Sequence, residues 1–263
     1  MKKILTGLAM AAVVTAQVLT TQAFAGTLKV AATAVPHAEI LEFLKPSLAK
    51  QGVTLDVKVF TDYVQPNVQV NEGRLDANFF QHQPYLTEFN NSRGTKLVSV
   101  VGVHVEPFGA YSTKHKKLAS LPERAQIALP NDATNGGRAL LLLQTAGLIT
   151  LSPEAGITAT PRDIISNPKK LRFKELEAAT LPRILGQVDL ALINTNYALE
   201  AGLNPAKDAL VIEGSDSPYV NILVVKAGNE KNADLVKLIA ALKTKAVSDF
   251  INTKYKGAVA PIY

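Results

Sequence analysis

The runs Leu28-Lys29-Val30-Ala31-Ala32 and Val53-Thr54-Leu55-Asp56-Val57-Lys58-Val59-Phe60 decide the fold class of this chain. The first run is short and apolar, as in a buried strand, and the second alternates strictly between apolar and other residues, which is the pattern of a strand. Residues 37–50 between them repeat aliphatic side chains at helical spacing, and Pro46 is expected to kink or divide that helix. Two strands joined through a helix pair in parallel, so the sequence predicts an α/β protein.

The second half of the chain repeats this order of elements. An apolar run at 127–129 precedes a polar loop and a helical stretch, and residues 171–176 alternate like the earlier strand. The segments Gly73-Arg74-Leu75-Asp76 and Gly186-Gln187-Val188-Asp189 share a pattern of glycine, any residue, aliphatic and aspartate, and a polar, aromatic cluster follows each. A pattern this short is only a hypothesis by itself, but the shared order supports it. We therefore expect two α/β lobes of like topology.

The chain is expected to cross between the lobes near residues 108–113 and 217–222. This assigns 26–110 and 222–263 to the first lobe and 111–221 to the second. Residues 232–250 are predicted to form one amphipathic helix. Because ligands of open α/β sheets bind beyond the carboxyl ends of the strands, a ligand cleft is expected between the lobes.

Residues 1–25 have the features of a secretory signal peptide. Two lysines are followed by an apolar run, and Ala23-Phe24-Ala25 forms a small-residue cleavage pattern before Gly26. The apolar run is too short to span a membrane. Removal of the segment takes away two lysines and no acids, which lowers the formal net charge from +6 to +4. The remaining basic residues are dispersed, so no nucleic-acid partner is expected.

Composition and motifs exclude several classes of function. The chain has no cysteine, which excludes disulfides, thiolate metal sites and a cysteine nucleophile. The four histidines show no metal-pair spacing, so no metal and no other cofactor is predicted. The sequence contains no G-x-S-x-G, H-E-x-x-H, Walker or S-x-x-K set that would carry catalysis. We therefore expect a binding protein and not an enzyme.

The stretch Leu129-Pro130-Asn131-Asp132-Ala133-Thr134-Asn135-Gly136-Gly137-Arg138 predicts an anion site at a helix start. It has the pattern of a strand, a polar loop and a helix with Arg138 in its first turn. A helix start favours anions, the two glycines would let a ligand approach the backbone, and arginine adds a bidentate donor. The expected ligand group is a carboxylate or a phosphate. The alternative is an ordinary helix cap with a solvated arginine.

Other predicted strand ends add amides and aromatic rings to this arginine. Arg138 could hold the carboxylate of an amino acid, asparagine oxygens could accept from its ammonium, and aromatic rings could enclose an apolar or thioether side chain. Each residue also has an ordinary alternative, because asparagine caps turns and helices and buried phenylalanine usually belongs to the core. The candidate ligand-binding residues are Tyr63, Phe80, His82, Tyr85, Asn135, Arg138, Asn194 and Asn221.

Several blocks of the chain resemble one known family. They are Thr61-Asp62-Tyr63-Val64-Gln65-Pro66-Asn67, Asn78-Phe79-Phe80-Gln81-His82-Gln83-Pro84-Tyr85-Leu86, 130–144, Ile193-Asn194-Thr195-Asn196-Tyr197-Ala198 and Ser217-Pro218-Tyr219-Val220-Asn221. In this order they are similar to the signature blocks of the NlpA/MetQ family, the substrate-binding proteins of methionine ABC importers. The resemblance implies a two-lobed periplasmic-binding-protein fold, similar to type II, that closes on a free amino acid, usually methionine.

The resemblance also implies roles for the candidate residues. Arg138 would hold the carboxylate, and Asn135, Asn194 and Asn221 would bind the polar groups of the ligand backbone. The side-chain pocket would be lined by Tyr63, Phe80, His82 and Tyr85.

This chain departs from the family pattern in two places. Many members carry a lipid on a cysteine after the signal, and this chain has no cysteine. We therefore expect a soluble, monomeric periplasmic protein that delivers methionine to a membrane permease with a cytoplasmic ATPase. Phe79 stands where the family often has a small residue, and it is expected to reshape the pocket. The alternatives are another hydrophobic amino acid, a methionine derivative or a dipeptide as ligand, and, in another class, a periplasmic enzyme or a surface adhesin.

Overall fold

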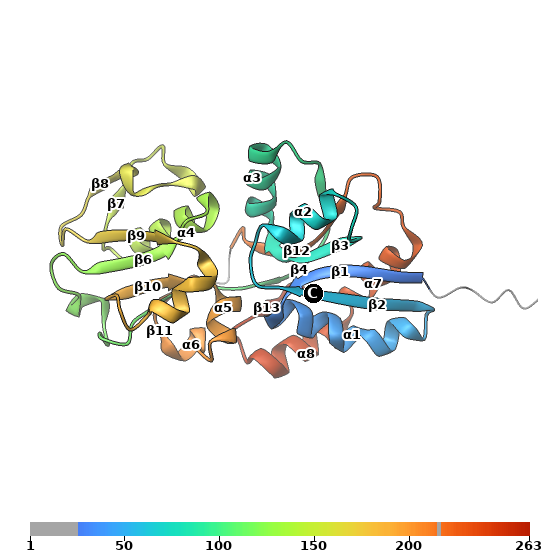
Figure 1. Ribbon diagram of the computed structural model, residues 1–263. Helices are drawn as coiled ribbons and strands as arrows, with labels where there is room; N and C mark the ends of the chain where they lie inside the picture. The colour runs from blue at the N-terminus through green and yellow to red at the C-terminus, as the bar shows by residue number, and fades with distance from the viewer. Residues whose placement is uncertain (1–25, 215–216) are drawn as a thin grey trace, which may run out of the picture.

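The computed structural model describes residues 26–214 and 217–263, so the predicted signal peptide lies outside the described residues. Most of its strands gather into two sheets that lie side by side (Figure 1), and one further pair of strands forms a small third sheet. The larger sheet contains β1 (Gly26–Thr33), β2 (Val53–Phe60), β3 (Ala77–His82), β4 (Leu97–Val105), β12 (Val220–Lys226) and β13 (Ala260–Pro261). The smaller sheet contains β5 (Gly109–Tyr111), β6 (Gln126–Pro130), β9 (Arg172–Leu176), β10 (Leu190–Ile193) and β11 (Ala209–Ile212).

Helices cover both faces of the larger sheet. One face carries α2 (Gln65–Asn71) and α3 (Gln83–Arg93), and the other carries α1 (Glu39–Ala49), α7 (Ala233–Leu242) and α8 (Lys245–Tyr255), as Figure 1 shows. The smaller sheet is accompanied by α4 (Ala133–Thr145), α5 (Thr195–Glu200), α6 (Pro205–Asp208) and the short pair β7 (Thr150–Leu151) and β8 (Ile164–Ser166). Short helical turns complete the chain at η1 (Ala34–Ala38), η2 (Leu118–Ser120), η3 (Gly156–Thr158), η4 (Pro161–Asp163) and η5 (Ala178–Ile184).

The two sheets share one topology, as the repeated order of elements predicts. In the larger sheet β1 pairs in parallel with β2 and β3, and β3 pairs antiparallel with β12. In the smaller sheet β6 pairs in parallel with β9 and β10, and β10 pairs antiparallel with β5. Each lobe therefore receives its antiparallel strand from the part of the chain that has crossed over.

The two aspartates of the repeated glycine motif make equivalent hydrogen bonds in the two sheets. Asp76 Oδ2 accepts a hydrogen bond of 2.7 Å from the backbone N–H of Lys29 on β1, and Asp189 Oδ2 accepts one of 2.8 Å from the backbone N–H of Gln126 on β6. The backbone N–H groups of both aspartates donate back to the same two residues, at 2.9 and 3.0 Å. The motif thus joins equivalent strands at their starts, which places it outside the ligand site.

The strands locate the crossings between the lobes. Gly109–Tyr111 belongs to the smaller sheet, although the predicted boundary assigned the chain up to residue 110 to the first lobe. Val220–Lys226 belongs to the larger sheet and starts two residues before the predicted return at 222. Each lobe has its own hydrophobic clusters around its sheet. The division into 26–110 with 222–263 and 111–221 stays a prediction at the level of single residues.

Two helix predictions were wrong in their bounds. Helix α1 runs through Pro46 without dividing, and Pro46 lies near the end of the helix with its side chain exposed. The predicted helix over 232–250 is two helices, α7 and α8, and the second begins after Thr244 in extended conformation. Both helices still bury an aliphatic face in the first lobe.

Candidate ligand-binding site

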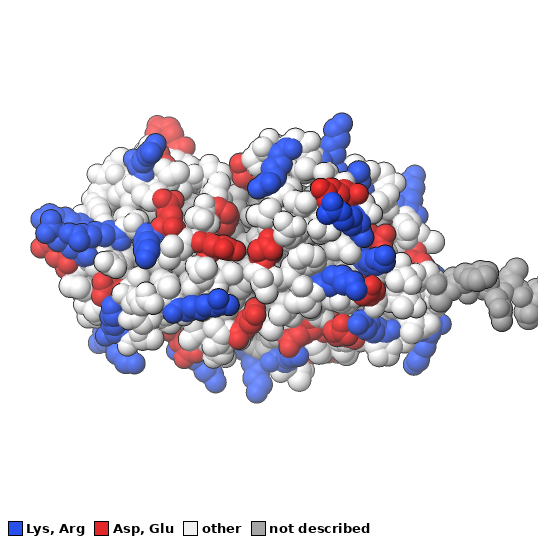
Figure 2. All heavy atoms as spheres, in the orientation of Figure 1, with Lys and Arg blue, Asp and Glu red and all other residues white. Residues whose placement is uncertain are grey.

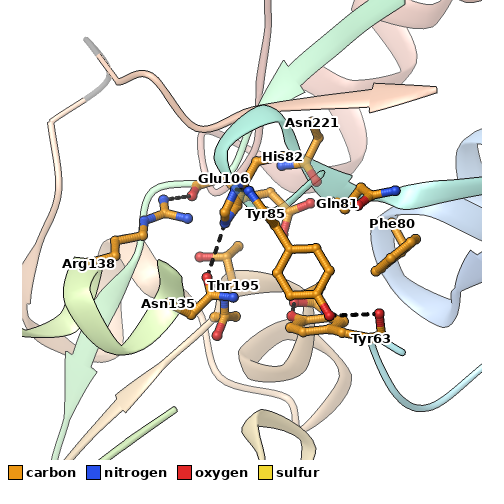
Figure 3. Close-up of a pocket in the computed structure, with 12 residues that line it drawn as sticks. Tyr63, Phe80, Gln81, His82, Tyr85, Glu106, Asn135, Arg138, Thr195 and Asn221 are labelled. Carbon is orange, nitrogen blue, oxygen red and sulfur yellow. Dashed lines mark hydrogen bonds between the residues drawn. The ribbon is translucent and has the colours of Figure 1, made fainter. Parts of the chain in front are cut away.

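A cavity lies between the two lobes, where the carboxyl ends of parallel strands from both sheets meet (Figure 3). All the ligand-binding residues predicted from the sequence line it: Tyr63, Phe80, His82, Tyr85, Asn135, Arg138, Asn194 and Asn221. The structure adds Gln81, Glu106, Thr195 and Asn196 to the lining. That these residues contact a ligand stays a prediction, but the structure brings them together.

Arg138 reaches the cavity from α4 and is almost completely buried. Its Nε donates to Glu213 Oε1 at 2.8 Å, and its Nη2 donates to Glu213 Oε2 at 2.5 Å and to the backbone oxygen of Glu106 at 2.8 Å. The guanidinium also lies 4.1 Å from the ring centroid of Tyr219. These contacts fix the plane of the guanidinium. Nη1 makes no hydrogen bond to any residue that the structure describes, so it can donate to a ligand.

The predicted anion site at the helix start is wrong in its details. Helix α4 begins at Ala133 with Asp132 as its N-cap, which places Arg138 in the second turn. The Asp132 carboxylate accepts the backbone N–H of Asn135 at 2.9 Å and so occupies the helix start itself. The side chain of Arg138, and not the free N–H groups of the helix, is therefore what this stretch contributes to the cavity.

The two glycines before Arg138 serve packing, and the prediction that they let a ligand approach the backbone is wrong. Both lie inside α4. A Cβ on Gly137 would lie 2.2 Å from the backbone oxygen of Ile157, and a Cβ on Gly136 would lie 2.9 Å from that of Pro130. The glycines thus allow α4 to approach neighbouring backbone segments of its own lobe.

A buried network of hydrogen bonds joins the lobes beside Arg138 (Figure 3). His82, the N-cap of α3, accepts the backbone N–H of Tyr85 on Nδ1 at 3.1 Å, so its Nε2 carries the proton and donates to Asn135 Oδ1 at 3.1 Å. Asn135 Oδ1 also accepts from Asn194 Nδ2 at 2.8 Å. Burial and the charge of Arg138 lower the pKa of His82 from 6.5 to about 3, which keeps this imidazole neutral.

Aromatic side chains enclose the opposite end of the cavity. The rings of Tyr63, Phe80 and Tyr85 lie within 6 Å of one another, centroid to centroid. Tyr85 donates to the backbone oxygen of Tyr63 at 2.9 Å (Figure 3). Tyr63 donates to Asn196 Oδ1 at 2.6 Å, and Tyr197 donates to the backbone oxygen of Thr61 at 2.9 Å. The last two bonds connect the lobes, so this end of the cavity is closed.

Glu106 is the buried acidic residue of the cavity lining. Its Oε1 lies 2.8 Å from His104 Nε2 and 3.3 Å from His37 Nε2. Burial raises the pKa of Glu106, and the proximity of His37 and Arg138 opposes this rise. Burial lowers the pKa of His37 to about 4 and that of His104 to about 3, so both imidazoles are neutral. The three side chains could in principle ligate a metal ion, although the sequence predicted none.

Phe79 does not line the cavity, so the expectation that it reshapes the pocket directly is wrong. The side chain is fully buried in the core of the first lobe. Its ring packs edge-on against His37, with centroids 4.7 Å apart, and against His104 at 5.4 Å. Successive strand residues point to opposite faces, which is why Phe80 faces the cavity while Phe79 supports the histidines behind it.

Two polar atoms of the lining have no protein partner. Among the described residues, Asn194 Oδ1 and Asn196 Nδ2 are buried and make no hydrogen bond. In the orientation that the structure gives the Asn196 amide, Oδ1 accepts from the hydroxyl of Tyr63 and Nδ2 has no partner among the described residues. A buried polar atom without a partner is costly, so the cavity presents one acceptor and one donor that a ligand can satisfy.

Sequence reasoning missed the acidic residues around Arg138 and part of the α5 start. Glu106 and Glu213 follow strand-like runs, and their positions alone do not distinguish them from surface acids. Thr195 and Asn196 could have been found, because they directly follow Asn194 at the end of β10. The same argument that selected Asn194 from its strand end applies to both neighbours.

The surface shows no large field of one sign on the face drawn in Figure 2, where basic and acidic side chains are interspersed. Within the described ranges 26–214 and 217–263, no helix is long and apolar enough to cross a membrane.

The chain is similar to known proteins over most of its length. A family model described as NlpA lipoprotein matches residues 28–263. The methionine-binding lipoprotein MetQ of Bacillus subtilis is 45% identical over 240 residues, which cover 89% of this chain and 87% of that protein. The D-methionine-binding lipoprotein MetQ of Escherichia coli is 44% identical over 210 residues, covering 79% of this chain and 78% of that protein.

A solved structure is similar over the same range. A nutrient-binding protein from Burkholderia cenocepacia, bound to methionine, has a TM-score of 0.87 and 45% identity, and the match covers 90% of this chain and all of that chain (100%). The two-lobed α/β fold predicted from the sequence is thereby confirmed.

Proposed function

Since this chain belongs to the NlpA lipoprotein family, we propose that it captures methionine, in the L or D form, and delivers it to an ABC permease for import. Relatives at 44–45% identity are named for methionine or D-methionine binding. The observation in the molecule that carries the proposal is the buried cavity, which combines one arginine, one glutamate, two unpartnered amide atoms and a wall of aromatic rings.

The polar end of the cavity is complementary to a free amino acid. Arg138 Nη1 donates to the ligand carboxylate, while Asn194 Oδ1 and the carboxylate of Glu106 accept from the ammonium group. Both charged side chains are buried, so their interactions with a ligand are little screened by water. His82 and Asn135 act by holding Asn194 in place.

The aromatic end of the cavity selects the side chain of the ligand. Tyr63, Phe80 and Tyr85 form an apolar wall, and a thioether packs favourably on aromatic rings. The closed contacts of Tyr63 and Tyr197 across the lobes leave no open channel for a long peptide at this point. A single amino acid therefore fits this cavity better than an extended peptide.

The unpartnered amide nitrogen of Asn196 favours a second candidate ligand, a methionine derivative. Asn196 Nδ2 lies beside Tyr63 at the aromatic end and lacks a protein acceptor among the described residues. The thioether sulfur is a weak acceptor. A methionine derivative that carries an oxygen acceptor on its side chain would satisfy this donor, and Asn196→Ala should then weaken that derivative more than methionine.

Delivery from the periplasm, by a soluble and monomeric protein without a lipid anchor, is part of the same proposal. The support is the signal-peptide pattern of residues 1–25, the lack of cysteine in the sequence, and a relative that is named a methionine-binding lipoprotein. Binding without turnover is expected, because lobe closure driven by contacts from both sides is sufficient for capture.

Native mass spectrometry of the freshly purified protein, followed by calorimetry with L- and D-methionine, tests the function. We expect a bound mass equal to methionine and a saturable heat of binding. A bound mass of another compound, or no heat with either form, would reject methionine. A hydrolytic rate that His82→Ala abolishes would instead identify an enzyme.

A further inference from the structure

A chain of buried side chains runs behind the cavity and ends at Asn221. Thr33 Oγ1 lies 2.8 Å from His37 Nδ1, and His37 Nε2 lies 2.9 Å from Asn221 Oδ1. His37 comes from η1 and Asn221 from β12, so the contact joins segments far apart in the sequence. His37 is 1% exposed and does not itself line the cavity. Its contacts therefore act on a ligand only through Asn221 and Glu106.

Glu106 decides which nitrogen of His37 carries the proton. Its Oε1 lies 3.3 Å from His37 Nε2 and 2.8 Å from His104 Nε2. Because this oxygen contacts two imidazole nitrogens, it acts as a hydrogen-bond acceptor. A bare Nε2 would place its lone pair against this oxygen. Nε2 therefore carries the hydrogen, and Nδ1 accepts from the hydroxyl of Thr33. His104 Nε2, at 2.8 Å from the same oxygen, donates in the same way.

The orientation of the Asn221 amide follows from this tautomer. A protonated Nε2 can face only the oxygen of an amide, so Asn221 Oδ1 is held by His37. The amide nitrogen of Asn221 is then the polar atom left for the cavity that Asn221 lines (Figure 3). The carboxylate is the strong acceptor of a zwitterionic amino acid, whereas its ammonium group only donates.

We propose that His37 is a positioning residue, which turns the Asn221 amide so that Nδ2 donates to the carboxylate of the bound amino acid. This inference rests on the proposed function for the identity of the ligand. Thr33 and Glu106 set the tautomer, whereas Phe79 only packs against the imidazole, edge-on at 4.7 Å between ring centroids, and makes no hydrogen bond to it. The chain Thr33, His37 and Asn221 thus adds a second carboxylate donor to Arg138.

Nitrogen-15 NMR of the histidines in the ligand-free protein tests the tautomer directly. We expect the Nε2-protonated form of neutral His37, and we expect Glu106→Gln to weaken this preference. A spectrum showing the Nδ1-protonated form would overturn the inference. This measurement needs no ligand, so it remains informative even if calorimetry rejects methionine.

Calorimetry with two ligands then separates positioning from a general structural effect. In His37→Phe the Kd of methionine should rise about tenfold, the effect of losing one hydrogen bond to a charged group. The Kd of methioninol, which lacks the carboxylate, should change less than about twofold, since no charged acceptor is lost. In His37→Gln the new amide can donate to Asn221 Oδ1, and methionine binding should recover most of the loss.

Phe79→Leu is the matched control, because it disturbs the packing of the same imidazole and removes no hydrogen-bond donor. It should shift both ligands by the same factor. Equal weakening of methionine and methioninol in His37→Phe would assign His37 a purely structural role and reject the proposal. Failure of the wild-type protein to bind methionine would reject the proposed function instead.

Discussion

Replacing Arg138 by alanine should reduce both the stability of the fold and the affinity for methionine, for two separable reasons. Arg138 and Glu213 form a pair whose side chains are 3% and 15% exposed. Removal of one partner from a buried pair leaves an unpaired charge and costs about 3 kcal/mol of unfolding free energy. Loss of the cation that faces the ligand carboxylate costs a further 2–4 kcal/mol of binding free energy, about a 30- to 900-fold rise in Kd.

A second substitution separates these two effects. In the Arg138→Ala background, Glu213→Gln removes the unpaired carboxylate and should restore about 2 kcal/mol of stability, since the amide has no charge to desolvate. It cannot restore the donor to the ligand. The double variant should therefore unfold at a higher urea concentration than Arg138→Ala and bind methionine equally weakly.

Urea denaturation monitored by circular dichroism gives the stability, and isothermal titration calorimetry gives the affinity. Arg74→Ala is the matched control, because its pair with Glu72 is 61% and 42% exposed and such pairs contribute about 0–1 kcal/mol. Methionine binding by Arg138→Ala within threefold of wild type would refute the carboxylate role. Failure of Glu213→Gln to recover stability in that background would refute the assignment of the cost to an unpaired carboxylate.

Three further predictions concern packing, closure and pH. Gly137→Ala places a Cβ 2.2 Å from the backbone oxygen of Ile157 and should destabilise by about 2 kcal/mol in urea unfolding, despite the better helix propensity of alanine; Gly186→Ala meets nothing within 4 Å and should be neutral. Tyr197→Phe removes the hydroxyl that donates to Thr61 across the lobes, so the dissociation rate of methionine measured by stopped-flow should rise about fivefold. Tyr255→Phe is the control: it loses its hydrogen bond to Glu39 within the first lobe and should leave this dissociation rate unchanged. The pKa values of His37, His82 and His104 are lowered from 6.5 to about 4, 3 and 3. Below pH 6.5 these histidines therefore bind protons in the unfolded chain and not in the folded one. The free energy of unfolding should be constant above neutrality and fall between pH 7 and 5.5 by about 1 kcal/mol for each histidine. The raised pKa values of Glu106 and Asp132 act in the opposite direction. If the free energy of unfolding measured in urea is the same at pH 7 and pH 5.5, the conclusion that the three histidines are neutral in the folded protein is contradicted.

The sequence by itself determined the fold class and predicted residues that the structure brings together in one cavity. Alternation over Val53–Phe60 and 171–176 predicts strands, because side chains of a strand alternate between two faces, and β2 and β9 occupy these positions. Residues directly after predicted strand ends, such as His82 and Asn194, meet in the cavity because parallel strands end at one edge of a sheet. These conclusions needed only local pattern and the rule that links it to topology.

Local chemistry did not determine where α4 starts. The sequence placed the helix start at the two glycines, and the structure places it at Ala133, where Asp132 caps the backbone. Aspartate and glycine are both common near helix ends, so the choice depends on the contacts that the helix makes afterwards. Close approach of Gly137 to Ile157, in a segment twenty residues away, is such a contact.

Only the tertiary structure decided which polar side chains face one another in and behind the site. Arg138 pairs with Glu213, 75 residues later, and His37 contacts Asn221, 184 residues later. Such hydrogen bonds produce no repeating pattern in the sequence, because they depend on how the two lobes pack together and on where the chain crosses between them. The sequence therefore predicted the residues that meet in the cavity, and the fold decided which of their polar atoms are already held by a neighbour.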